Sequence, residues 1–155
     1  MDDAKRLKLI IEAIRYCRRV RAMGMPPACY SKAFREPVHF LWERRLGTKT
    51  RIARFRSKNA KGLNFGRGNL VYDHAVPFRY LQAELLGLSD VTMQSVANAL
   101  SRFETIVLIT KEEDSRLSAA GYGSKMPPDW DGRDDLARYR AIGIELIENT
   151  AAIQQ

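Results

Sequence analysis

Cysteine and histidine are scarce in this chain of 155 residues, which contains two of each. Cys17 and Cys29 lie in unlike contexts and form no Cys-x-x-Cys motif, so the sequence predicts neither a disulfide framework nor a zinc site. Long hydrophobic runs are also absent, and stretches such as Ile106 to Ile109 are far too short to span a bilayer. Residues Asp2 to Arg6 are charged where a secretory signal would be apolar, and we therefore expect a cytoplasmic protein.

Acidic residues are few in the first half of the chain, although the overall net charge is only +8. Residues 1–68 contain 18 Lys and Arg against 5 Asp and Glu, a net charge of +13. Residues 69–155 contain 8 against 13, a net charge of −5. A basic half of this size indicates a polyanionic partner, and we expect nucleic acid, DNA rather than RNA, and no membrane partner. Self-association as a homodimer stays open.

The first 46 residues predict a pair of helices. From Asp2 to Met23 six apolar residues recur at helical spacing, namely Leu7, Ile10, Ile11, Ile14, Cys17 and Val20. A second helix is predicted over Ser31–Leu46, with a disturbance at Pro37, because proline removes a helical hydrogen bond. The inward residues of this second helix would be Phe34, Val38, Leu41, Trp42 and Leu46.

Residues 47–68 are rich in basic residues and glycine, which predicts a loop or a loose hairpin. Phe55 and Phe65 within this segment would serve either packing or base stacking. One interpretation is a surface that follows a phosphate backbone, and the other is a solvated connector. The candidate nucleic-acid contacts are Arg51, Arg54, Arg56, Lys58, Lys61 and Arg67.

The rest of the chain alternates short strands and helices. Strands are predicted at Asn69–Tyr72 and Thr105–Ile109, and a helix is predicted from Pro77 to Gly87. Ser89-Asp90 is predicted to cap the next helix, and Thr110 with Glu113 forms the pattern of a capping box. Acidic residues around Trp130 lack the spacing of a calcium loop, and Asp134 or Asp135 is predicted to begin a final helix that ends near Glu148.

These elements predict a single α+β domain, mainly helical, with a small two-stranded core. Its parts would be a helical pair at 1–46, a basic loop at 47–68, a core with a helical insert at 69–120, and a loop and helix at 121–155.

One short motif indicates a candidate catalytic site. The sequence GNLVYDHAVP places Asp73 and His74 at the end of a strand, and ITKEEDSRL follows the second strand. Over residues 69–117 this pattern resembles the HNH or His-Me finger endonucleases, whose ββα-metal core carries a histidine at a strand end and a metal ligand on the closing helix. The chain departs from the family in two respects, because about 30 residues with two helices separate the strands and Asp114 stands where a helical histidine is usual.

The resemblance implies a division of roles between the acidic residues and the histidine. Asp73 would bind the metal, His74 would be the general base, and Asp114, or else Glu113, would be the second metal ligand. Oxygen ligands favour Mg²⁺ or Mn²⁺ over zinc, and such an ion with an imidazole suffices for phosphodiester hydrolysis. We therefore expect a metal-dependent endonuclease.

Structural explanations remain open for the same residues. His74 would then hold the turn before the Pro77 helix, and Asp114 would be an ordinary acidic residue in the first turns of a helix, where the helix dipole favours it. On this basis two further functions stay open. One is a non-catalytic nucleic-acid-binding or regulatory protein, and the other is a protein-interaction module.

Overall fold

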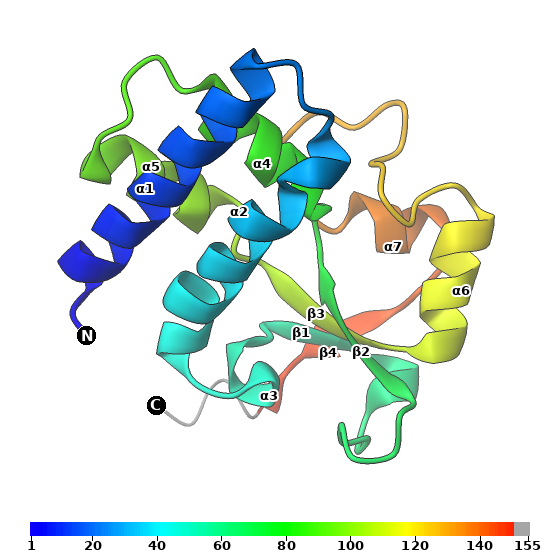
Figure 1. The fold of residues 1–155 in the computed structure, drawn as a ribbon. Helices are drawn as coiled ribbons and strands as arrows, with labels where there is room; N and C mark the ends of the chain where they lie inside the picture. Colours follow the sequence, from blue (N-terminus) through cyan, green and yellow to red (C-terminus); the bar gives the residue numbers. More distant parts are fainter. Residues whose placement is uncertain (151–155) are drawn as a thin grey trace. The chain divides into compact units, whose positions relative to one another are not determined.

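The computed structural model describes residues 1–150 and divides the chain into two compact units (Figure 1). Unit 1 combines residues 1–47 with residues 78–102, and unit 2 combines residues 48–77 with residues 103–150. Taken together, the two units contain helices and one sheet, which confirms the α+β class. Within residues 1–150, none of the helices has the length and apolar character needed to cross a bilayer.

Unit 1 begins with the long helix that its periodicity predicts. Helix α1 spans Asp3–Ala22, and the carboxylate of Asp2 caps it by accepting a hydrogen bond from the backbone N–H of Lys5 at 2.7 Å. All six residues predicted to face inward are buried. Helix α1 therefore forms as the sequence predicts.

The segment predicted as the second helix, residues 31–46, consists of an α-helix, a π-helical turn and a 3₁₀ turn. A short 3₁₀ turn at Pro27–Cys29 precedes α2, which spans Ser31–Pro37. A π-helical turn at Val38–Trp42 and a 3₁₀ turn at Glu43–Leu46 follow. The disturbance expected at Pro37 is present. Because a π turn changes the angular register of the residues that follow it, Leu46 is 44% exposed instead of facing inward.

Two shorter helices complete unit 1. Helix α4 spans Phe78–Gly87 and α5 spans Met93–Arg102. The prediction that Ser89-Asp90 caps α5 is wrong. The side chain of Thr92 accepts a hydrogen bond from the backbone N–H of Ser95 at 3.1 Å, so the cap lies closer to the helix.

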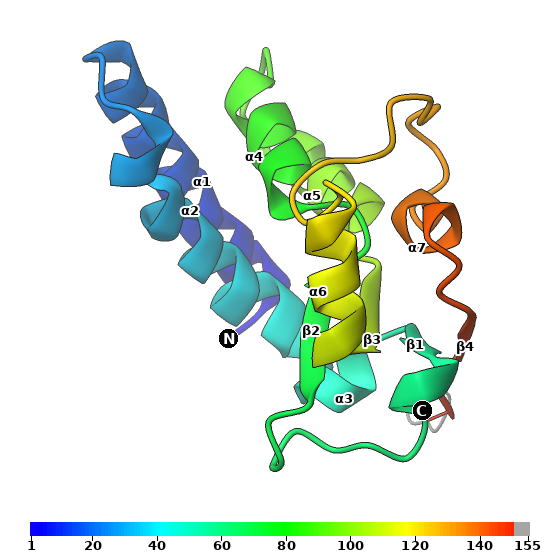
Figure 2. The ribbon, with the colours of Figure 1, turned by 90° about the vertical axis from the view of Figure 1, so that its right-hand side faces the viewer.

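Unit 2 is built around a four-stranded mixed sheet, not the two strands that the sequence predicts (Figure 2). The strands are β1 (Phe55–Ser57), β2 (Leu70–His74), β3 (Ile106–Thr110) and β4 (Leu146–Glu148), in the spatial order β2-β3-β1-β4. Strand β3 pairs with β2 antiparallel and with β1 parallel, and β4 pairs with β1 antiparallel. The two expected strands are neighbours in this sheet.

The basic segment 47–68 is not the loop that the sequence predicts. It contains helix α3 (Lys49–Ile52), strand β1, and a 3₁₀ turn at Lys58–Ala60. Strand β1 lies inside the sheet, with Ala53 and Ser57 fully buried around it. Its three residues are too few to produce a periodicity that separates them from the surrounding basic residues.

The predicted C-terminal helix is also largely replaced. Helix α7 covers only Ala137–Ala141, and the chain then turns at Gly143, whose φ of +70° is a conformation that glycine adopts without strain. The backbone N–H of Ile144 returns to the carbonyl of Tyr139 at 2.9 Å, and strand β4 follows. The turn at Gly143 therefore separates α7 from β4, where the sequence predicts one helix that continues to about Glu148.

Helix α6 (Lys111–Ala119) follows β3 directly, and its capping box is present as predicted. The two faces of the sheet have separate cores. One contains Ala75, Val107, Ile109 and Leu117 together with Tyr139 and Ile144. The other contains Leu70, Ile106 and Leu108 together with Ala53 and Ala60.

Candidate functional site

Asp73 lies in a buried polar network at the end of β2. Its carboxylate accepts a hydrogen bond from Arg138 Nη2 at 2.8 Å and another from the hydroxyl of Tyr139 at 2.6 Å. Only 1% of Arg138 is exposed, and its guanidinium also donates to the carbonyls of Ala75 at 3.0 Å, of Tyr122 at 2.7 Å and of His74. These contacts join the end of β2 to α7.

Burial dominates the electrostatics of this network. It raises the pKa of Asp73, while Arg138 and the hydrogen bond from Tyr139 oppose that rise. Burial also raises the pKa of Tyr139 well above its ordinary value, and the neighbouring Asp73 carboxylate raises it further. Tyr139 is therefore a neutral hydrogen-bond donor at physiological pH.

His74 is directed away from Asp73. Successive residues of a strand point to opposite faces of a sheet, and Val71 and Ala75 pack in the core beside Tyr139 whereas Leu70 and Tyr72 pack in the other core. Asp73 shares the first face and contacts Tyr139 there. His74 shares the second face and makes an edge-on ring contact with Tyr72, with 5.7 Å between ring centroids.

Glu113 holds α6 to β1. Its buried carboxylate accepts hydrogen bonds from Ser57 Oγ at 2.6 Å, from Asn59 Nδ2 at 3.0 Å and from the backbone N–H of Thr110 at 2.9 Å. The Thr110 contact belongs to the capping box. Both carboxylate oxygens of Glu113 thus accept hydrogen bonds that stabilise the fold.

The charge of Asp114 raises the pKa of Asp73, and this is the smallest of the effects on that group, after burial, Arg138, Tyr139 and His74. Arg138 and Tyr139 both donate to Oδ2 of Asp73, and three donors contact the two oxygens of Glu113, so these oxygens already accept hydrogen bonds from the protein and are poorly suited to hold Mg²⁺ or Mn²⁺. Among residues 1–150 no three His, Cys, Asp or Glu side chains are grouped as metal ligands would be.

The six basic residues predicted to contact nucleic acid divide into two kinds. Arg56 is buried, and its Nη1 donates to the carbonyls of Ala60 at 2.9 Å and Leu63 at 3.3 Å. Lys58 is exposed and forms an ion pair with Glu145. The guanidinium of Arg56 is thus used inside the fold, whereas Lys58 is paired at the surface. The remaining four are exposed, namely Arg51, Arg54, Lys61 and Arg67.

The two phenylalanines of the basic segment also differ. Phe55 packs against the core that contains Tyr139, and the Arg54 guanidinium lies 5.2 Å from its ring centroid. Phe65 lies at the border of the opposite core, where the ammonium of Lys49 is 5.7 Å from its centroid and 5.6 Å from that of Tyr72. Aromatic and basic side chains thus lie together at Lys49.

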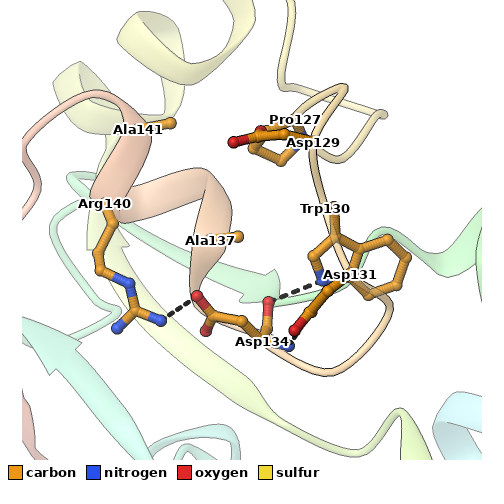
Figure 3. A pocket seen from close by; sticks show the side chains of 8 residues that line it. All are labelled: Pro127, Asp129, Trp130, Asp131, Asp134, Ala137, Arg140 and Ala141. Carbon is orange, nitrogen blue, oxygen red and sulfur yellow. Dashed lines mark hydrogen bonds and ion pairs between the residues drawn. The ribbon is translucent and has the colours of Figure 1, made fainter.

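A shallow hollow of about 460 Å³ lies beside α7 and the loop before it (Figure 3). Trp130 lines it, and its indole N–H donates to the carbonyl of Asp134 at 2.9 Å. The Asp134 carboxylate pairs with Arg140, and Asp131 accepts hydrogen bonds from the backbone N–H groups of Arg133 and Asp134, which lower its pKa. Trp130, Asp131 and Asp134 thus make contacts that order the loop.

Comparison with protein-family models, curated proteins and solved structures finds no match for this chain.

Sequence reasoning missed Arg138 and Asn149 as organising residues. The Asn149 side-chain N–H₂ donates to the carbonyls of Thr50 at 2.6 Å and Ala53 at 2.8 Å. Arg138 stands in the charged run ARYR, where nothing distinguishes a buried arginine from an exposed one. Arg138 contacts Asp73 and Ala75, and Asn149 contacts Thr50, and all of these partners are more than 60 residues away, so no local pattern identifies the two residues.

Proposed function

We propose that this protein binds nucleic acid through the basic segment that precedes β2. The observation that carries the proposal is the charge of the stretch between Glu43 and Asp73, which contains nine Lys and Arg and no acidic residue. Arg51, Arg54, Lys61 and Arg67 are exposed within it. Exposed cations without neighbouring acids in sequence are suited to contacts with successive phosphates.

The backbone that carries Arg51 and Arg54 is held in place, which favours a binding surface over a solvated connector. Asn149 bonds to Thr50 and Ala53, and the backbone N–H of Asn149 donates to the carbonyl of Arg54 at 3.0 Å. The backbone N–H of Arg54 donates to the carbonyl of Ile106, also at 3.0 Å. An ordered backbone reduces the conformational entropy that binding would otherwise cost.

Salt dependence tests this proposal directly. Replacing Arg51, Arg54 and Arg67 together with glutamine should flatten the slope of log K against log salt by about two units or more, since each phosphate contact contributes 0.7 to 0.9. Thermal stability should change little, because exposed charges contribute little to folding. Binding is measured by fluorescence anisotropy of a labelled oligonucleotide from 50 to 300 mM salt, roughly the range in which such contacts are sensitive.

The matched control removes three exposed arginines from unit 1, namely Arg19, Arg21 and Arg35, and so lowers the net charge equally. The proposal expects this control to retain most of the slope. An equal loss of slope in both triple variants would assign the effect to net charge, and a loss only in the control would place the surface on α1 and α2.

Hydrolysis of the bound nucleic acid is the second candidate, and the packing of α6, which carries Asp114, against β2, which carries Asp73, favours it. All three residues of the predicted finger belong to unit 2, but His74 points to the opposite face of the sheet from Asp73. Binding without cleavage has the stronger support, because protein donors already contact Oδ2 of Asp73 and both carboxylate oxygens of Glu113.

A further inference from the structure

Three rings and one ammonium group form a row along one face of β2. The ammonium of Lys49 lies 5.7 Å from the ring centroid of Phe65 and 5.6 Å from that of Tyr72, and the Tyr72 ring meets the His74 ring at 5.7 Å. We refer to Phe65, Lys49, Tyr72 and His74 as the aromatic row. Each of the four side chains is half-buried and keeps part of its surface exposed.

The row is assembled from three separate parts of unit 2. Lys49 is the first residue of α3, Phe65 lies in the turn before β2, and Tyr72 and His74 are alternate residues of β2 itself. Packing fixes the two rings nearest Lys49, because Phe65 and Tyr72 both contact the core that contains Leu70 and Leu108. Their positions are therefore set by the fold and not by chance contact of mobile side chains.

Basic side chains surround this row along the chain. Arg51 is two residues from Lys49, and Arg67 is two residues from Phe65. Both arginines are exposed. Cations that follow a backbone, combined with rings that offer a flat apolar face, are the two components by which proteins hold unpaired nucleotides.

We propose that the nucleic acid bound by this protein is single-stranded and that an unpaired base stacks on the aromatic row, with Phe65 as its main platform. The proposal rests on the nucleic-acid binding proposed above. A base in a duplex has both of its faces covered by neighbouring bases, so a surface ring cannot stack on it unless the duplex opens. Lys49 supplies the phosphate contact beside the stacked base.

The decisive variants change the ring of Phe65 and keep its apolar packing. In Phe65→Leu the side chain stays apolar and able to contact the core, but the aromatic face is lost. We expect affinity for a single-stranded oligonucleotide to fall about fivefold or more, because stacking on one ring contributes at least that much. Phe65→Trp restores an aromatic face and should restore affinity. The slope of log K against log salt should be unchanged in Phe65→Leu and in Phe65→Trp, since neither substitution alters a charge.

The matched control is Phe40→Leu, which changes a phenylalanine that is 63% exposed in unit 1 and should leave affinity unchanged. Lys49→Gln should lower the salt slope by about 0.7, the value for one contact with a single strand. Each variant is titrated with a single-stranded 20-mer of DNA, the matching RNA and the corresponding duplex, and its melting temperature is recorded.

The outcomes separate the two proposals. Equal affinity for the duplex and the single strand, or unchanged affinity in Phe65→Leu, overturns the stacking proposal while the arginine triple variant still tests the phosphate surface. Failure of the wild-type protein to bind any of the three nucleic acids overturns both. A preference for RNA or for DNA within the single strands identifies the sugar without altering the stacking proposal.

Discussion

Replacing Arg138 with methionine should strongly destabilise unit 2. Methionine keeps much of the apolar stem but leaves the buried Asp73 carboxylate without its cation and three carbonyls without a donor. Removing one partner of a buried ion pair typically costs about 3–5 kcal/mol. A domain of ordinary stability, about 5–15 kcal/mol, would still fold with much of its stability gone.

The loss of stability in Arg138→Met should depend on pH, and the contact between Arg138 and Asp73 determines the direction of that dependence. Arg138 lowers the pKa of Asp73 against the larger effect of burial, so its removal raises that pKa further above the ordinary value of 3.8. The folded variant then binds a proton that the unfolded chain releases. Its stability relative to the wild type therefore falls as pH rises from about 4 to neutral, and the destabilisation is smallest in acid, where Asp73 is uncharged.

Urea unfolding followed by circular dichroism at pH 4, 5.5 and 7 measures this difference, and other titrating groups cancel between the two proteins. Arg140→Met is the matched control. This arginine is also in α7, but its side chain is 63% exposed, and the loss of its ion pair with Asp134 should cost about 1 kcal/mol or less. A destabilisation by Arg138→Met that matches this control, or one that does not grow with pH, would refute the reasoning.

Two further predictions follow from the contacts of the predicted finger. Ser57→Ala removes a hydrogen bond to the buried Glu113 carboxylate and should cost about 1.5–3 kcal/mol in urea unfolding, whereas Ser118→Ala on the exposed end of α6 should cost far less. If the protein cleaves nucleic acid as the second candidate holds, nicking of a plasmid should require Mg²⁺ or Mn²⁺ and be lost in His74→Ala. Activity that survives in His74→Ala would exclude this histidine as the general base.

The sequence predicts those elements whose signal is local and repeated. Helix α1 has six inward residues at helical spacing, and the Thr110–Glu113 capping box is a pattern of four residues. Strand β3 is a continuous apolar run. In each case the residues that determine the element are adjacent or one turn apart, so the pattern can be read without the fold.

The parts that the sequence does not predict depend on distant partners. Strand β1 is recognised only by its pairing with β3 and β4, and β4 replaces the end of a predicted helix because Gly143 adopts a positive φ. In the candidate site, Asp73 and His74 are adjacent in sequence, but their side chains point to opposite faces of the sheet. The partner of Asp73 is 65 residues away, which no short motif encodes.

The position of β1 between β3 and β4 also determines the order in which this chain can fold. Unit 1 has all of its described segments once residue 102 has been synthesised, but β1 must then wait for β3 and for residues 146–148 before both of its edges are paired. Before β3 has been synthesised β1 has no partner strand, and one of its edges then stays unpaired until β4 has been synthesised. Pairings so distant in sequence slow folding, and the rate-limiting event of unit 2 should be the capture of β1 after its final neighbour has emerged.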